Sequence, residues 1–91
     1  MSTTVEKSPF EVAVENVKLL KNPPTDDEKL QIYALYKQST IGDIDIECPS
    51  WFNMTARAKY DAWNKHKGVD KEAAKLLYIK LVHELTAKYN I

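Results

Sequence analysis

The sequence predicts an all-α protein: one four-helix domain with a long loop between its second and third helices. Apolar residues recur at spacings of three or four in four separate segments, which is the period of an amphipathic helix. Sustained alternation of apolar and polar residues is absent, and so are the Asn-Gly and Asp-Gly pairs typical of hairpins. Amphipathic helices bury their apolar faces against one another, so we expect a bundle.

The first helix is expected over about residues 8–21. Ser8 can cap its N-terminus, and Pro9 suits the first helical position. The "NPP" that follows should end it, because the residue before a proline avoids the helical region. One apolar stripe is formed by Phe10, Val14, Val17 and Leu20. We expect residues 1–7 to be a flexible extension.

The second helix is expected to run from the capping residue Thr25 to about Ile41. Glu28 lies three residues after Thr25, which is the spacing of a capping box. Gly42 suits the left-handed residue that ends many helices. The loop over 43–53 carries four large apolar residues, and we therefore expect it to pack down over the helices; they are Ile44, Ile46, Trp51 and Phe52.

The third helix is expected over about 55–67, with Gly68 as its stop. The fourth is expected from the capping residue Asp70 to about Tyr89. Its broad apolar face comprises Ala74, Leu77, Tyr78, Leu81, Val82 and Leu85.

Composition excludes several classes of function. The 91 residues fit one domain over 1–91, and their net charge of zero argues against a general nucleic-acid binder. Cys48 is the only cysteine, which leaves no internal disulfide, fits a reducing compartment and, with two histidines, makes no zinc set. No apolar run approaches the length that spans a bilayer. We expect a cytoplasmic protein without stable membrane insertion, metal or cofactor.

Lysines interrupt the apolar faces. On a helical wheel, Lys37 falls about 20° from Leu30, on the side of Tyr33. Lys59 shares a side of the third helix with Trp63, and Lys18 lies beside the first apolar stripe. Such lysines commonly lay their stems on the surface and extend their amines into water. The alternative is that they converge on an anion, with tyrosines offering hydroxyls and a ring face for a base.

Enzymatic motifs are not apparent in the sequence. Two glycines cannot make a Gly-rich phosphate loop, and Cys48 has no recognisable base beside it. We therefore do not expect an enzyme.

Two motifs carry a family resemblance. "YALYKQSTIGD" and "AKYDAWNKHKG" resemble the two signatures of the small acyl-CoA-binding proteins, and the resemblance extends over about residues 10–91. It implies an up-down-down-up four-helix bundle that binds medium- or long-chain fatty acyl-CoA esters, one per protein, as an intracellular carrier and pool former. It also implies a monomer that contacts acyl-CoA-using enzymes only transiently.

The resemblance assigns roles to individual residues. It implies that Tyr36 stacks on the adenine, and that Tyr33, Lys37 and Lys59 hold the ribose 3′-phosphate. The remaining assignments are Lys18 near the adenine and phosphates, Tyr78 at the ligand site, and Val14 and Leu30 along the acyl chain. The sequence departs from the family pattern at Thr55, at Tyr60 and in the loop around Cys48 and Trp51. These departures keep open a second hypothesis, a helical protein-interaction module with the same fold that binds acyl-CoA weakly or not at all.

Overall fold

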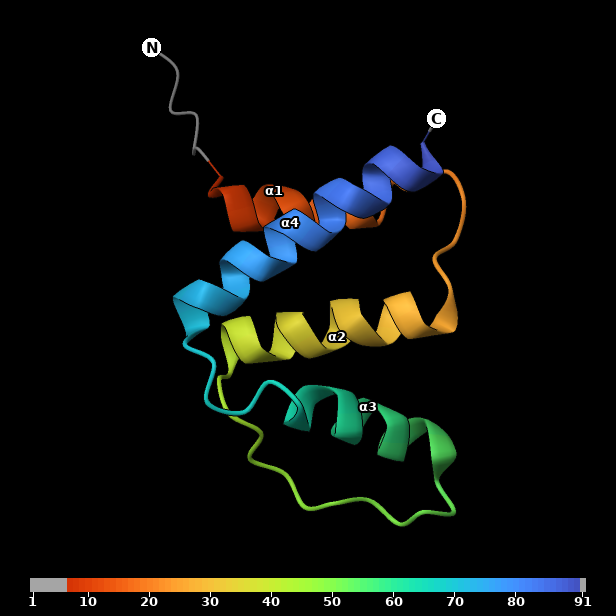
Figure 1. The fold of residues 1–91 in the computed structure, drawn as a ribbon, viewed down its shortest axis with the longest axis vertical. Coiled ribbons are helices and arrows are strands. Elements are labelled where there is room, and N and C mark those ends of the chain that lie inside the picture. Colours follow the sequence, from red (N-terminus) through yellow and green to blue (C-terminus); the bar gives the residue numbers. More distant parts are fainter. Residues whose placement is uncertain (1–6, 91) are drawn as a thin grey trace.

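A computed structural model describes residues 7–90, and within them it contains four helices and no strand. The helices are α1 (Pro9–Val17), α2 (Asp26–Thr40), α3 (Met54–Asn64) and α4 (Lys71–Tyr89). Figure 1 shows α1 and α4 running in one direction and α2 and α3 in the other, so the predicted up-down-down-up order is confirmed. The expected extension lies mostly outside the described residues.

The helices do not contribute equally to the core. α4 packs on both α1 and α2, whereas α3 packs on α2 alone among the described helices. The result is a flat molecule of 53 × 29 × 19 Å with α3 at one edge (Figure 1). Its main apolar cluster contains the buried residues Ala13, Leu35, Tyr78 and Val82. The core therefore lies where α1, α2 and α4 meet, and α3 depends on α2 for its position.

The predicted helix starts are confirmed. Ser8 Oγ accepts from the Glu11 N–H at 3.2 Å, and Glu11 accepts from the Ser8 N–H at 3.0 Å. Thr25 and Glu28 form the same reciprocal pair at 3.1 and 2.8 Å. Asp70 caps α4. These caps satisfy N–H groups that a helix cannot pair internally.

The expected end of the first helix was wrong, because α1 stops at Val17 rather than near Lys21. The N–H groups of Lys18 and Leu19 bond three residues back, which tightens and ends the helix. The Lys21 N–H then donates to Asn90 Oδ1 at 2.8 Å, a group at the far end of the chain. Anchoring to the C-terminus of α4 thus replaces a last helical turn.

The expected end of the third helix was three residues too late. α3 ends at Asn64, and the N–H groups of His66 and Lys67 bond three residues back. Gly42 and Gly68 adopt φ values of +96° and +92°, as expected for the residues that end α2 and α3.

The expected packing of the 43–53 loop was also wrong. Trp51 and Phe52 are 69% and 77% exposed, and Ile46 is 50% exposed. Figure 1 shows the reason: the loop runs along the outer side of α3, where no other helix faces it. On α4 the buried face is narrower than expected, and Leu77 is exposed.

A hydrogen-bond network joins the end of α2 to the segment that follows α3. The Gln38 side-chain amide donates to Asp43 Oδ1 at 2.9 Å and to the Val69 carbonyl at 2.8 Å. The Gly68 N–H donates to the same Asp43 oxygen at 2.7 Å. Hydrogen bonds from Gly68 and then Gln38 lower the pKa of Asp43. The network ties the C-terminus of α2 to the α3–α4 connection.

Trp63 adds a second attachment. Its side chain is 1% exposed, and its indole N–H donates to the Gly42 carbonyl at 2.9 Å. Within residues 7–90, none of the four helices combines the length and apolarity needed to span a bilayer.

Candidate functional site

Two lysines from different helices converge on one tyrosine. The Nζ atom of Lys37, on α2, lies 5.9 Å from the centre of the Tyr33 ring. The Nζ atom of Lys59, on α3, lies 5.4 Å from the same ring. Lys37 Nζ is also 5.6 Å from the Trp63 ring, so its stem crosses the surface above a buried indole. We call Tyr33, Lys37 and Lys59 the cation cluster.

Among the described residues, the cation cluster has no carboxylate partner. Ion pairs in this part of the chain use Lys7, Arg57, Lys75 and Lys88 instead. Two ammonium groups held near one ring repel each other, and the ring faces attract each of them by about 0.5–1 kcal/mol at an exposed site. An anion that accepts from both would relieve the repulsion. The cluster is therefore suited to a phosphate group.

A second group of aromatic residues lies one turn further along α2. The rings of Tyr36 and Phe10 stack with centroids 6.1 Å apart and planes 19° apart. Tyr78 lies beneath them, 5.1 Å from Phe10 and 6.2 Å from Tyr36. Tyr36 remains 39% exposed, so part of the ring is available to a ligand. We call Phe10, Tyr36 and Tyr78 the aromatic cluster.

Tyr78 has a supporting position within that cluster. Its side chain is 1% exposed, and burial, followed by the nearby Tyr36, raises its pKa to about 12. Its phenol therefore stays neutral at physiological pH. Tyr78 fixes the orientation of Tyr36 and Phe10 by packing against both.

A hollow of about 390 Å³ opens beside the cation cluster, toward the N-termini of α2 and α3. We call it the α2–α3 groove. Leu30, Met54 and Ala58 supply apolar surface, and Tyr33 and Lys59 belong to both the groove and the cation cluster. The remaining lining residues are Asp26, Lys29 and Thr55.

The three features follow one another along α2. Tyr36, Tyr33 and Leu30 are spaced by three residues, and Asp26 comes one turn before Leu30. At 1.5 Å per residue, they span about 15 Å. An exposed aromatic ring, a pair of cations and an apolar groove therefore lie in that order. The order suits an elongated ligand with a base at one end, phosphates within and an apolar chain at the other.

Other residues expected at the site are placed less directly. Lys18 follows the last residue of α1, is exposed, and forms no ion pair within residues 7–90. Val14 is partly buried against the core cluster. The structure thus brings Tyr33, Lys37 and Lys59 together with Leu30, and Tyr36 with Tyr78. It records no such contact of Lys18 or Val14 with the cation cluster.

Sequence reasoning missed three residues. Phe10 was expected only in the core, yet it stacks on Tyr36. Lys75 lies with its Nζ 5.8 Å from the Phe10 ring, beside the aromatic cluster. Met54 lines the groove. The position of Lys75 three residues before Tyr78 on α4 was the available signal for it.

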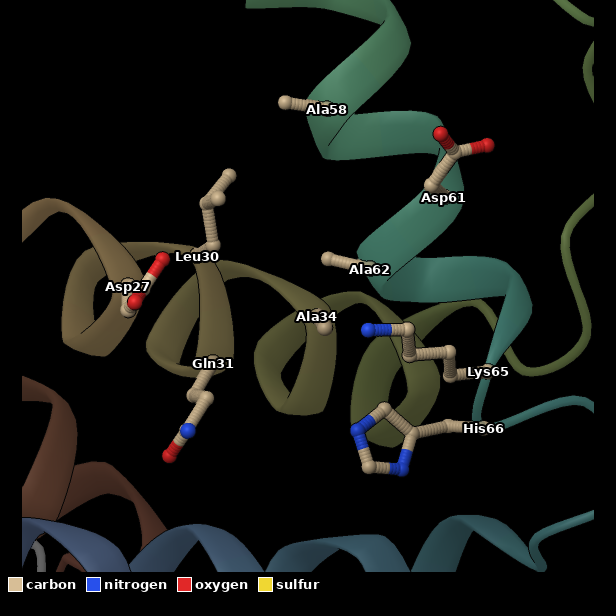
Figure 2. A pocket seen from close by; sticks show the side chains of 9 residues that line it. All are labelled: Asp27, Leu30, Gln31, Ala34, Ala58, Asp61, Ala62, Lys65 and His66. Carbon is tan, nitrogen blue, oxygen red and sulfur yellow. The ribbon is translucent and has the colours of Figure 1, made fainter.

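A second hollow, of about 620 Å³, lies on the other flank of the α2–α3 contact. Figure 2 shows Ala34 and Ala62 facing each other across its floor, with Asp27 at one end and Lys65 and His66 at the other. The described residues that line this hollow include no tyrosine, phenylalanine or tryptophan on which a base could stack. We therefore favour the groove beside the cation cluster, although it is smaller. In the described residues, no group of three His, Cys, Asp or Glu side chains is placed to hold a metal.

Comparisons with known proteins point to one family. The family model described as acyl CoA binding protein matches residues 7–82. A protein from a species of Hypsibius, provisionally named as an acyl-CoA-binding protein, is 48% identical over 79 residues, which cover 87% of this chain and 89% of that protein.

Solved structures agree with that match. The crystal structure of acyl-CoA-binding protein 2 from Oryza sativa has a TM-score of 0.83 at 38% identity, covering 88% of this chain and 89% of that one. The solution structure of the acyl coenzyme A binding protein from yeast has a TM-score of 0.71 at 48% identity, and the match covers 90% of this chain and 95% of that one.

Proposed function

The chain belongs to the acyl-CoA-binding protein family, and from that premise we propose that it binds medium- and long-chain fatty acyl-CoA esters, one per protein, as a carrier and pool former. The observation that supports this most directly is the order along α2 of exposed Tyr36, of Tyr33 with the two ammonium groups near its ring, and of Leu30 in the apolar groove. An acyl-CoA ester has the same order of base, phosphates and apolar chain.

Each part of the ligand has a proposed partner. Tyr36 stacks on the adenine, Lys37 and Lys59 hold phosphate oxygens together with the Tyr33 hydroxyl, and Leu30 contacts the acyl chain. Tyr78 acts through Tyr36. For Lys18 and Val14 the family resemblance is the sole support. We propose that residues 1–91 act as one binding domain, monomeric and cytoplasmic, that catalyses no reaction.

Acyl-CoA chain length provides the test. Burying one methylene is worth about 0.8 kcal/mol, so affinity should rise about fourfold per methylene until the groove is full. Calorimetry with butyryl-, octanoyl-, dodecanoyl- and palmitoyl-CoA measures this slope. Equal affinity across the series would contradict the apolar groove. Absence of binding heat with any of them, at micromolar protein, would favour the interaction module instead.

A further inference from the structure

The loop before α3 exposes a cluster of large apolar side chains that the proposed ligand site does not use. Trp51 is 69%, Phe52 77% and Met54 78% exposed. The Trp51 and Phe52 rings stack on each other with centroids 4.0 Å apart, and not on the core. We call these three residues the apolar ridge. Exposed apolar patches of this kind mark sites that contact another protein, a membrane or a ligand.

The ridge is continuous with the α2–α3 groove. Met54 belongs to the ridge and also lines the groove, next to Thr55 and Leu30. Trp51 and Phe52 do not line the hollow, but they precede Met54 by only three and two residues. A surface that covers the ridge would therefore also face the groove entrance, where the acyl chain is proposed to lie.

The position of the loop and its tryptophan indicate that the ridge meets a lipid bilayer. Figure 1 shows the loop along the outer edge of the molecule, away from α1 and α4, so a flat surface can reach it without meeting another helix. Lys29 and Lys59 line the groove beside the ridge together with Asp26, and all three are exposed. Asp45 and Glu47, in the loop itself, are also exposed, so these charges largely cancel and do not select an anionic bilayer. Tryptophan is enriched at the boundary between headgroups and hydrocarbon.

We propose that the apolar ridge is a membrane-contact surface, with which the protein rests its groove entrance on a lipid bilayer while the acyl chain passes between bilayer and groove. Trp51 and Phe52 enter the interfacial region, and the helices stay outside it. This inference rests on the proposed function, because the groove must hold an acyl chain for the contact to serve transfer.

The test uses the full chain and vesicles of phosphatidylcholine and phosphatidylserine. Trp51 is exposed and Trp63 is buried, so a blue shift of emission on adding vesicles reports Trp51. The shift should disappear in Trp51→Phe. The double variant Trp51→Ala/Phe52→Ala should bind vesicles at least about tenfold more weakly in a flotation assay and should slow palmitoyl-CoA transfer from vesicles.

A matched control removes apolar surface elsewhere. Leu19 and Leu76 are 71% and 69% exposed and lie outside the ridge, so Leu19→Ala/Leu76→Ala should bind vesicles like the parent. Vesicle binding that is unchanged in the ridge variant, or equally weakened in the control, would overturn the proposal. A blue shift with palmitoyl-CoA alone and none with vesicles would also overturn it, since the ridge would then cover the ligand.

Calorimetry separates this inference from the proposed function. The ridge variant should bind dissolved palmitoyl-CoA like the parent, because Trp51 and Phe52 do not line the groove. If the parent binds vesicles but no acyl-CoA in solution, the proposed function fails while the ridge remains a membrane contact. If the parent binds acyl-CoA but no vesicles, only the membrane contact fails.

Discussion

Replacing Lys37 or Lys59 by methionine removes one of the two charges that share the Tyr33 ring. Methionine keeps most of the apolar stem, so the change isolates the ammonium group. A hydrogen bond to a charged group contributes about 1.5–3 kcal/mol, and each variant should therefore bind palmitoyl-CoA roughly 10- to 150-fold more weakly. Calorimetry at low and moderate salt measures the loss, which should shrink as salt screens the charges.

The double variant tests whether both lysines hold one anion. Both Nζ atoms lie within 6 Å of the same ring centre, at 5.9 and 5.4 Å, and we propose on this ground that one phosphate accepts from both. Contacts that share a partner are not additive, and the coupling should reach about 0.5–3 kcal/mol. With palmitoyl-dephospho-CoA, which lacks the 3′-phosphate, most of the single-variant losses should disappear.

Lys65→Met is the matched control. Lys65 lies at the end of α3, like Lys59 on an exposed helix surface, but it lines the second hollow. It should bind palmitoyl-CoA like the parent. If Lys65→Met weakened binding while Lys37→Met and Lys59→Met did not, the ligand would occupy the hollow of Figure 2 and the reasoning from the cation cluster would be refuted.

Three further predictions concern the groove and the scaffold. Leu30→Trp should fill the groove, lowering affinity for palmitoyl-CoA at least about tenfold by calorimetry while leaving free CoA binding unchanged; equal losses for both ligands would contradict this. Trp63→Phe leaves the Gly42 carbonyl without its donor and should lower the free energy of unfolding in urea by about 1–3 kcal/mol, whereas an unchanged midpoint would show that water replaces the indole. Hydrogen bonds from Lys88, Tyr89 and Thr25 lower the pKa of Glu28 to about 2, from 4.5, so the stabilisation is complete above about pH 4.5 and lost as pH falls toward 2. Glu28→Gln should flatten the decline of stability in that range, and a parallel pH profile would contradict the assignment.

Local patterns in the sequence predicted the helices well, and long-range contacts explain the errors. Capping at Ser8 and Thr25 depends on neighbours three residues away, and both caps were predicted. The end of α1 depends on Asn90, which anchors the Lys21 N–H across 69 residues, and no local pattern reveals it. The prediction that the 43–53 loop is buried was wrong for a related reason. Apolar content predicts burial only where another element is available to cover the loop.

The sequence predicted the contacts of the site that lie within one helix, but not those between helices. The wheel placed Lys37 beside Tyr33 because both lie on one helix. The approach of Lys59 to the same ring depends on how α3 packs on α2, which only the family resemblance suggested beforehand. Phe10 of α1 stacks on Tyr36, and Lys75 of α4 lies near the Phe10 ring. Periodicity within a single helix cannot identify such contacts.

The two signature motifs combine residues with two different tasks. Gln38, Asp43 and Trp63 hold α3 to α2 through buried or shared hydrogen bonds, and they make no use of a ligand. Lys37 and Lys59 lie in the same two motifs, yet they have no carboxylate partner in the described residues. They join α2 to α3 only through contacts with the Trp63 and Tyr33 rings, worth about 0.5–1 kcal/mol each. A relative could therefore keep the scaffold residues and the fold while losing the lysines. The motif match therefore supports the fold through the scaffold residues. The case for acyl-CoA binding, over an interaction module with the same fold, depends on the two lysines, which this chain retains together with Tyr33 and Tyr36.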